Sequence, residues 1–257
     1  LVKNFYIVFE AIIDELIGSS VDKAALPKEL TEQKDGKLVD HLYTYKGLMQ
    51  PEGEETQTYY IGDSKYYRIG GHLGEHSIYK QYTYARNIIQ YNINLWLDES
   101  KPSPDIKVRD DQTEGYNILP NFFISAAMEK DDFSYSHREI KLTPMKDNPT
   151  VQYQFEDRLF DRDTMLLSRY NVNFLFVIAL YARNKQSEKA VWKEEVRREF
   201  RKNIQDVLAT QYQFYPMRSK GVVPKDYVQT HFKQLIGKVF TPFDDKEILT
   251  LALQNPS

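Results

Sequence analysis

The chain contains no cysteine. Disulfide bonds and metal sites held by thiolates are therefore excluded, and the composition favours a reducing compartment, so we expect a cytoplasmic protein. The chain also lacks a long apolar run, since its most apolar stretch, residues 172–182, spans 11 residues and includes Asn173. Such a run is too short to cross a bilayer and predicts a buried helix, so we expect no membrane association.

Positive charge is not in excess. The chain has 34 lysine and arginine residues against 37 aspartate and glutamate residues, a net charge of −3. This balance excludes a uniformly basic nucleic-acid-binding protein, because phosphate affinity follows local lysine and arginine. No G-x-x-x-x-G-K-[S/T] motif occurs, so the sequence predicts no P-loop nucleotide site. With 257 residues, 41% of them apolar, the chain is able to bury a substantial core.

The aromatic-rich stretch over residues 59–67 predicts a β-strand. Side chains alternate along a strand, so Asp63 and Lys65 share one face with Ile61. A carboxylate can hold a divalent metal ion, and a lysine beside it can position or deprotonate a water molecule. The same pair is also typical of a solvated ion pair on an edge strand, and this stretch alone does not separate the two interpretations.

Two further acidic residues lie beside apolar side chains. In the strand predicted over residues 38–45, Asp40 shares its face with Leu42. An unpaired carboxylate on an apolar face is costly, so Asp40 requires a partner such as a metal ion, an arginine or backbone donors. In the helix predicted over residues 4–17, Glu10 falls at the edge of the apolar stripe. An ordinary boundary glutamate is the simpler interpretation of Glu10 taken alone.

A long helix is predicted over residues 76–97 from apolar residues at helical spacing. Gln81 lies on the inner flank of its apolar stripe, and Lys80 points more outward. An amide near the core at this position is able to hydrogen-bond a lysine or a metal-bound water. The alternative is a boundary residue whose polar atoms are satisfied locally.

Further elements follow the same patterns along the chain. They are a strand over 117–127, another strand at 140–142 or 151–155, a mainly helical segment over 159–183, a long helix over 187–213, a loop over 216–224, a short helix over 226–236, and a closing strand or helix over 248–253. The sequence therefore predicts a single domain over residues 1–257. Its core motif falls in residues 4–127, and residues 128–257 supply a mainly helical elaboration and closing elements.

The two acid-bearing strands are consecutive. If they pair as a hairpin, Asp40 and Asp63 converge with Lys65 beside them. Two converging carboxylates and a lysine are a common arrangement for hydrolysing a phosphodiester. In that arrangement the acids hold Mg²⁺, the metal stabilises charge in the transition state, and the lysine helps to activate water.

This order of elements resembles the PD-(D/E)XK nuclease superfamily. More closely, it resembles the LlaJI-type restriction endonucleases, which are similar to the McrC nuclease subunit. The resemblance covers most of the chain and is carried by Phe9-Glu10, Leu38-Val39-Asp40, Gly62-Asp63-Ser64-Lys65-Tyr66, the stretch I-Y-K-Q-Y-T-Y-A at 78–85, and later stretches within 160–175 and 231–238.

The resemblance implies an α/β fold with a PD-(D/E)XK restriction-endonuclease-like core, in which helices flank a mixed central sheet, and a helical C-terminal elaboration. It implies that Asp40 and Asp63 bind Mg²⁺, with Mn²⁺ as a substitute, and that Lys65 is the catalytic lysine. It also implies that Glu10 contacts the metal or its water and that the main-chain carbonyl of Ser64 is a further ligand.

The McrC-like pattern also pairs a glutamine with a tyrosine four residues later. In this chain Lys80 with Tyr84 and Gln81 with Ala85 each match that spacing in part. The periodicity of the helix favours Gln81 as the functional residue.

The function that the resemblance implies is a Mg²⁺-dependent endonuclease, comparable to type II restriction enzymes, acting on double-stranded DNA in a restriction or phage-defence system. A second nuclease copy, as a homodimer, is expected because cutting both strands takes two active sites. A separate GTP-hydrolysing motor or specificity subunit is implied, since this chain has no P-loop. Two alternatives stay open: a DNA-repair or junction-resolving nuclease, and a catalytically inert DNA-binding subunit on the same fold.

Overall fold

The structure is a computed structural model of the whole chain. The parts it describes are residues 4–18, 30, 39–48, 57–66, 74–97, 119–128, 134–143, 150–153, 165–218, 220–235, 239–240 and 247–254.

In the part of the chain that the structure describes, six strands form a mixed central sheet. They are β1 (His41–Lys46), β2 (Gln57–Lys65), β3 (Leu119–Ala127), β4 (Ile140–Leu142), β5 (Thr150–Tyr153) and β6 (Met165–Asn173). The sheet has the order β1-β2-β3-β6-β4, and β5 also pairs with β6. β1 and β2 are antiparallel, β2, β3 and β6 run parallel, and β4 and β5 are antiparallel to β6.

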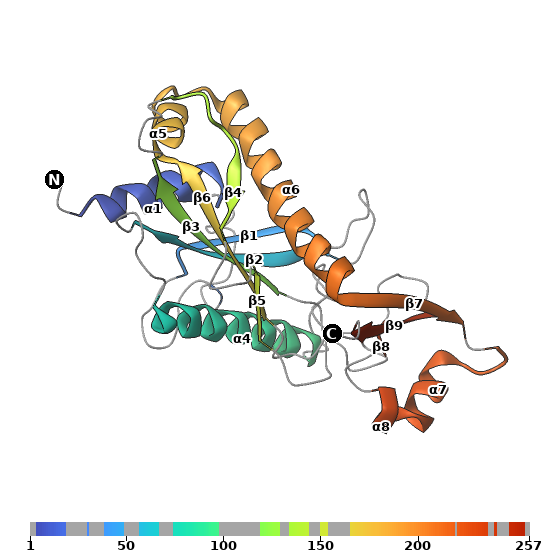
Figure 1. Cartoon of the computed structure of the whole chain (residues 1–257). Coiled ribbons are helices and arrows are strands. Elements are labelled where there is room, and N and C mark those ends of the chain that lie inside the picture. The colour runs from blue at the N-terminus through green and yellow to red at the C-terminus, as the bar shows by residue number, and fades with distance from the viewer. Residues whose placement is uncertain are drawn as a thin grey trace.

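Helices cover both faces of this sheet (Figure 1). The first face carries α1 (Phe5–Leu16), α5 (Phe174–Ala182) and α6 (Gln186–Gln211), and the second carries α4 (Glu75–Leu97). The expected α/β class, with helices flanking a mixed central sheet, is confirmed.

Alternation along β1 and β2 divides the core into two parts. Tyr43 and Tyr60 point to the first face, where they pack with Phe9 of α1. Leu42 and Ile61 point to the second face, where they pack with α4. Because successive side chains of a strand point to opposite faces, Asp63 and Lys65 belong to the same face as Ile61. The candidate site is therefore on the α4 side of the sheet.

The helical stripes agree with the sequence patterns. In α1 the buried residues are Phe9, Ile12, Ile13 and Leu16, which recur at helical spacing. α4 begins at Glu75, one residue before the predicted start, and buries Tyr84, Ala85 and Ile88 against the sheet.

The prediction of a mainly helical segment over residues 159–183 is wrong in its described first part. Residues 165–173 form the strand β6 and not the first part of a helix, and only Phe174–Ala182 is helical. β6 lies inside the sheet, so neighbouring residues are buried toward both faces, as Leu166 and Leu167 are. A strand buried on both faces has no alternation of polar and apolar residues, which makes its sequence resemble a buried helix.

The C-terminal part contains more sheet than expected. β7 (Tyr212–Arg218), β9 (Ile248–Gln254) and β8 (Val239–Phe240) form a second sheet in that order, with α7 (Pro224–Thr230) and α8 (Phe232–Leu235) beside it (Figure 1). Pro216 indicated a loop, but it lies in β7, an edge strand, where a missing N–H is tolerated. β4, β5 and β6 also belong to the central sheet, so the sheet continues into the part of the chain that was expected to supply a mainly helical elaboration.

Within the described parts of the chain, no helix combines the length and the apolar character that a membrane span requires.

The close approach of Gly62 to Phe122 gives a test of the sheet packing. A Cβ at Gly62 would lie 2.2 Å from the Phe122 ring, and that ring is itself packed against Phe200 at 4.6 Å between centroids. We expect Gly62→Ala to lower the free energy of unfolding by about 1–3 kcal/mol, because the core has no room for a methyl group. Urea unfolding measures this change.

The matched control is Gly74→Ala, since a Cβ at Gly74 meets nothing within 4 Å. A loss of stability in the Gly74 variant as large as that in the Gly62 variant would contradict the packing explanation.

Candidate functional site

Asp40 and Asp63 meet where β1 begins and β2 ends. The antiparallel ladder pairs His41 with Gly62. One more step of the same register places Asp40 opposite Asp63, and side chains of directly opposed residues lie on the same face. The expected convergence of Asp40 and Asp63 is therefore present, and it follows from the hairpin.

Asp63 and Lys65 form a close ion pair on this face. The Lys65 Nζ donates to Asp63 Oδ2 at 2.5 Å, and it lies 5.7 Å from the centroid of the Phe123 ring. The side chain of Asp63 is 1% exposed, and its second oxygen, Oδ1, has no hydrogen-bond partner among the residues that the structure describes. A buried carboxylate oxygen without a partner is costly, so this position is suited to a cation or a further hydrogen-bond donor.

Asp40 holds its proton unusually tightly. Burial is the largest cause that raises the pKa of Asp40 to about 8, and the carboxyl group of Asp63 and the charge of Glu10 add to it. The charge of Lys80 acts in the opposite direction. Two neighbouring carboxyl groups in a buried place cannot both ionise at low cost. One proton therefore stays on the pair at neutral pH until further positive charge is supplied.

Lys80 reaches the site from α4, which corrects the expectation that it points outward. Its Nζ lies 4.0 Å from Oδ1 of Asp40 and 4.0 Å from Oδ2 of Asp63. Burial lowers the pKa of Lys80, but a hydrogen bond with Tyr84 and the charges of both aspartates outweigh it, so the pKa lies above its usual value. The side chain of Lys80 starts on the flank of the helix, and because it is long and flexible its ammonium group reaches the carboxylates.

Gln81 faces inward, as the periodicity predicted. It is 0% exposed, and neither its side-chain oxygen nor its nitrogen has a hydrogen-bond partner in the described part of the chain. The expected hydrogen bond from Gln81 to a lysine is not formed there. Of the two adjacent helix residues, Lys80 is the one in contact with the carboxylates.

The other two predicted residues lie around this centre. Glu10, on α1, is half-buried, and its charge contributes to the raised pKa of Asp40. Ser64 lies between Asp63 and Lys65 in the sequence, so its side chain points to the opposite face, where it contacts His41.

Ser125 was missed by the sequence reasoning. It lies on β3 opposite Lys65 in the parallel register, it is 4% exposed, and its hydroxyl has no hydrogen-bond partner among the described residues. A serine within an apolar strand carries no signal in the sequence, because its proximity to Lys65 depends on how β2 and β3 pair.

The donor set suits a hard divalent cation. Asp40, Asp63 and Glu10 can contribute three negative charges, whereas Lys65 and Lys80 contribute two positive ones. Within the described residues, no group of three or more histidine, cysteine, aspartate or glutamate side chains is arranged to hold a metal ion. Mg²⁺ is commonly bound through one or two carboxylates while water and substrate oxygens complete its shell. Asp40 and Asp63 therefore fit such an ion, and the charge of Glu10 acts on Asp40.

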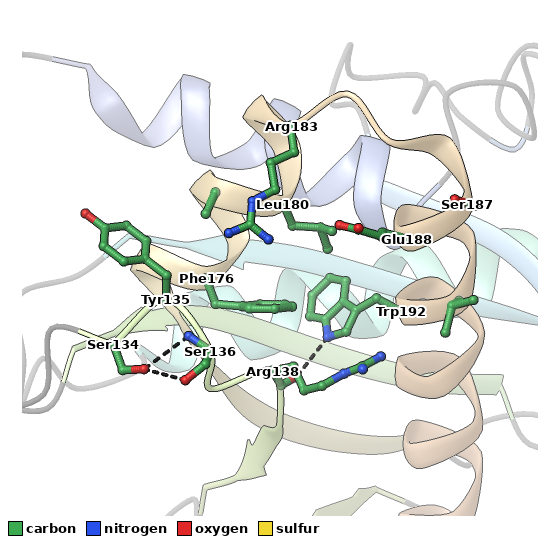
Figure 2. Close-up of a pocket in the computed structure, with 12 residues that line it drawn as sticks. Ser134, Tyr135, Ser136, Arg138, Phe176, Leu180, Arg183, Ser187, Glu188 and Trp192 are labelled. Carbon is green, nitrogen blue, oxygen red and sulfur yellow. Dashed lines mark hydrogen bonds between the residues drawn. The ribbon is translucent and has the colours of Figure 1, made fainter.

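A separate pocket of about 600 Å³ lies between α5, α6 and the segment before β4. Figure 2 shows Phe176 and Trp192 facing each other in this pocket, with Arg183 above them and Arg138 below. None of the candidate site residues lines it.

In comparisons with known proteins, no family model, curated protein or solved structure matches the chain.

The raised pKa of Asp40 predicts how stability depends on pH. The folded protein keeps a proton on Asp40 up to about pH 8, whereas the unfolded chain loses it near pH 3.8. Folding is therefore increasingly opposed as the pH rises through this interval. We expect Asp40→Asn to raise the free energy of unfolding by about 1–3 kcal/mol at pH 8.5 and by less at pH 5, because the amide cannot ionise.

Urea unfolding at both pH values, without divalent ions, measures the effect. Asp206→Asn on the exposed face of α6 is the control and should show no such pH dependence. An Asp40→Asn effect that is equal at pH 5 and pH 8.5 would contradict the raised pKa.

Proposed function

We propose that this chain is a metal-dependent DNA endonuclease that hydrolyses phosphodiester bonds. The observation that carries the proposal is the meeting of Asp40 and Asp63 beside Lys65, at one end of two adjacent strands, on a mixed sheet covered by helices. The order helix, strand, strand, helix and then a strand parallel to the second one supports the PD-(D/E)XK resemblance. In that fold the same order carries the acids and the lysine.

Each residue has a separate task in the proposed reaction. Asp40 and Asp63 would hold a Mg²⁺ or Mn²⁺ ion, which supplies Lewis-acid stabilisation of the negative charge that develops on the phosphoryl oxygens. Asp63 also anchors the Lys65 ammonium through Oδ2. Lys65 orients the attacking water and offers a positive charge toward the phosphate. Lys80 adds a second positive charge from α4, within 4.0 Å of both carboxylates.

The biological setting follows from the resemblance. We propose that the chain is the cleavage subunit of a restriction or phage-defence system. Cutting both strands of a duplex requires two active sites, which favours a second nuclease copy. A separate GTP-hydrolysing motor or specificity subunit would supply the nucleotide-driven step, because no P-loop motif occurs in this chain.

Plasmid cleavage tests the proposed activity. Supercoiled DNA incubated with the protein and Mg²⁺ or Mn²⁺ should be nicked and linearised, and EDTA should stop the reaction. We expect Asp63→Asn and Lys65→Ala to reduce the rate by about 10²–10³-fold, because each removes charge that acts in the transition state. Asp206→Asn and Lys202→Ala, both exposed on α6, are matched controls for charge change.

Cleavage that persists in Asp63→Asn or Lys65→Ala would assign the activity to another site or to a contaminant. Calorimetric titration with Mn²⁺ provides a test that does not need a partner subunit, since binding should occur in the wild type and be lost in Asp63→Asn.

Lys80 and Gln81 can be separated by their different surroundings. Lys80→Ala should reduce cleavage by about 10–100-fold, because the ammonium lies near both carboxylates. Gln81→Leu should leave cleavage near the wild-type rate and raise the free energy of unfolding by about 1 kcal/mol or leave it unchanged, since it replaces a buried amide that lacks partners. Cleavage and urea unfolding are measured on both variants. A large loss of cleavage in Gln81→Leu alone would reverse the assignment.

A further inference from the structure

Three side chains form a hydrogen-bonded chain on the α1 side of the sheet, opposite the carboxylates. The imidazole of His41 lies in the middle: Nδ1 is 3.2 Å from Oδ1 of Asp14, and Nε2 is 2.6 Å from Oγ of Ser64. His41 has no exposed surface. A carboxylate only accepts, so His41 donates through Nδ1–H to Asp14, and its Nε2 shares a hydrogen bond with the Ser64 hydroxyl.

The local backbone leaves room for this arrangement. His41 pairs with Gly62, so Ser64 is its diagonal neighbour on the same face, and no side chain intervenes at Gly62. At the other end, a Cβ on Gly18 would lie 2.6 Å from Oδ1 of Asp14 and 3.3 Å from Nδ1 of His41. Only glycine fits against the Asp14–His41 contact without displacing it.

Each member of the chain is next to a residue of the candidate site. Asp14 follows Glu10 by one turn of α1, His41 follows Asp40, and Ser64 separates Asp63 from Lys65. Because side chains alternate along a strand, His41 and Ser64 point to the face opposite Asp40, Asp63 and Lys65, and α1 brings Asp14 to that same face. The hydrogen bonds between Asp14, His41 and Ser64 thus join the three segments that carry the site.

The hydrogen bond at Ser64 acts where strand pairing stops. The β1–β2 ladder ends at His41 and Gly62, while β2 continues to Lys65 alongside β3. On the β1 side, residues 63–65 lie beyond the ladder. The contact between Ser64 and His41 ties this end of β2 to β1 at the place where Asp40 and Asp63 face each other.

The same residue types form the nucleophilic triad of many hydrolases, but the surroundings differ here. A nucleophilic serine needs space for a substrate and donors for an oxyanion. On the Ser64 face, Tyr66 packs against Phe5 and Phe9, with ring centroids 5.3 and 5.9 Å apart. His41 is fully buried, and Ser64 is partly buried. These contacts favour a role in holding the strand.

We infer that Asp14, His41 and Ser64 are positioning residues that fix the main chain of residues 63–65 and so set the geometry of the metal site. The inference rests on the proposed function, because it concerns the site at which Asp40 and Asp63 would hold the ion. Residues that orient metal ligands without touching the metal commonly change metal affinity by 10- to 100-fold.

Mn²⁺ binding to the full chain, measured by calorimetry, tests this inference without requiring cleavage. We expect Ser64→Ala to weaken Mn²⁺ binding by about 10-fold or more, and Ser64→Thr, which keeps the hydroxyl, to bind within about threefold of the wild type. Asp14→Asn should weaken binding in the same direction, because it removes the charge that holds His41. Amide hydrogen exchange at Ser64 and Lys65 should be faster in Ser64→Ala.

The matched control is Thr58→Val. Thr58 is also buried on β2, and its hydroxyl has no hydrogen-bond partner among the described residues, so its loss should leave Mn²⁺ binding unchanged. Urea unfolding establishes that each variant is folded under the titration conditions.

Three results would overturn the inference. If the wild type binds Mn²⁺, Asp63→Asn does not, and Ser64→Ala binds as the wild type does, the metal site stands and the positioning role fails. If the wild type itself binds no Mn²⁺, the metal site and the positioning role fail together. Covalent labelling of Ser64 by a fluorophosphonate, located by mass spectrometry, would show instead that the serine is a nucleophile.

Discussion

Two carboxyl groups lie close together in a buried place at the end of the β1–β2 ladder. The charges of the other residues in the candidate site act on these two groups. The side chains of Asp40 and Asp63 are 15% and 1% exposed. At such depth water screens their repulsion poorly, so the proton of Asp40 is retained to about pH 8. Lys65 and Lys80 compensate part of the charge, and Glu10 adds to it. Under the proposed function, an added cation would release the retained proton and pair with both carboxylates.

The sheet makes this arrangement by simple geometry. The hairpin register sets Asp40 against Asp63, and strand alternation places Lys65 beside them. α4 packs on the same face and supplies Lys80, while α1 packs on the other face and supplies Asp14. Each helix is held by its apolar stripe, so the polar residues of the site depend on core packing for their positions. A charge placed in this way can be pre-organised before any ligand arrives.

The alternation of side chains along strands and the spacing of apolar residues along helices could be predicted from the sequence. Strand alternation was enough to select Asp40, Asp63 and Lys65 as candidate site residues. Other features required three-dimensional information. β6 is buried on both faces, so its sequence lacks the alternation of polar and apolar residues that is typical of a strand. The edge strand β7 contains Pro216, which in the sequence indicated a loop. Lys80 was misplaced because the direction of a helix position does not fix where a long, flexible side chain ends. Ser125 and the Asp14–His41–Ser64 chain depend on strand register and on contacts between distant residues.

The two faces of the β1–β2 hairpin also bear on the alternative of an inert acidic cluster. On the α1 side, Asp14 and Ser64 meet opposite nitrogens of one enclosed imidazole, so the polar atoms satisfy one another within the chain. On the α4 side, Oδ1 of Asp63 is buried without a hydrogen-bond partner among the described residues. The pKa of Asp40 is raised to about 8, far above its usual value. An acidic cluster that served only stability would be expected to have its carboxylate oxygens paired within the chain, because a buried polar atom without a partner lowers stability. The unpaired oxygen of Asp63 lies on the side that carries both lysines, which is where a metal ion and a phosphate would complete its interactions.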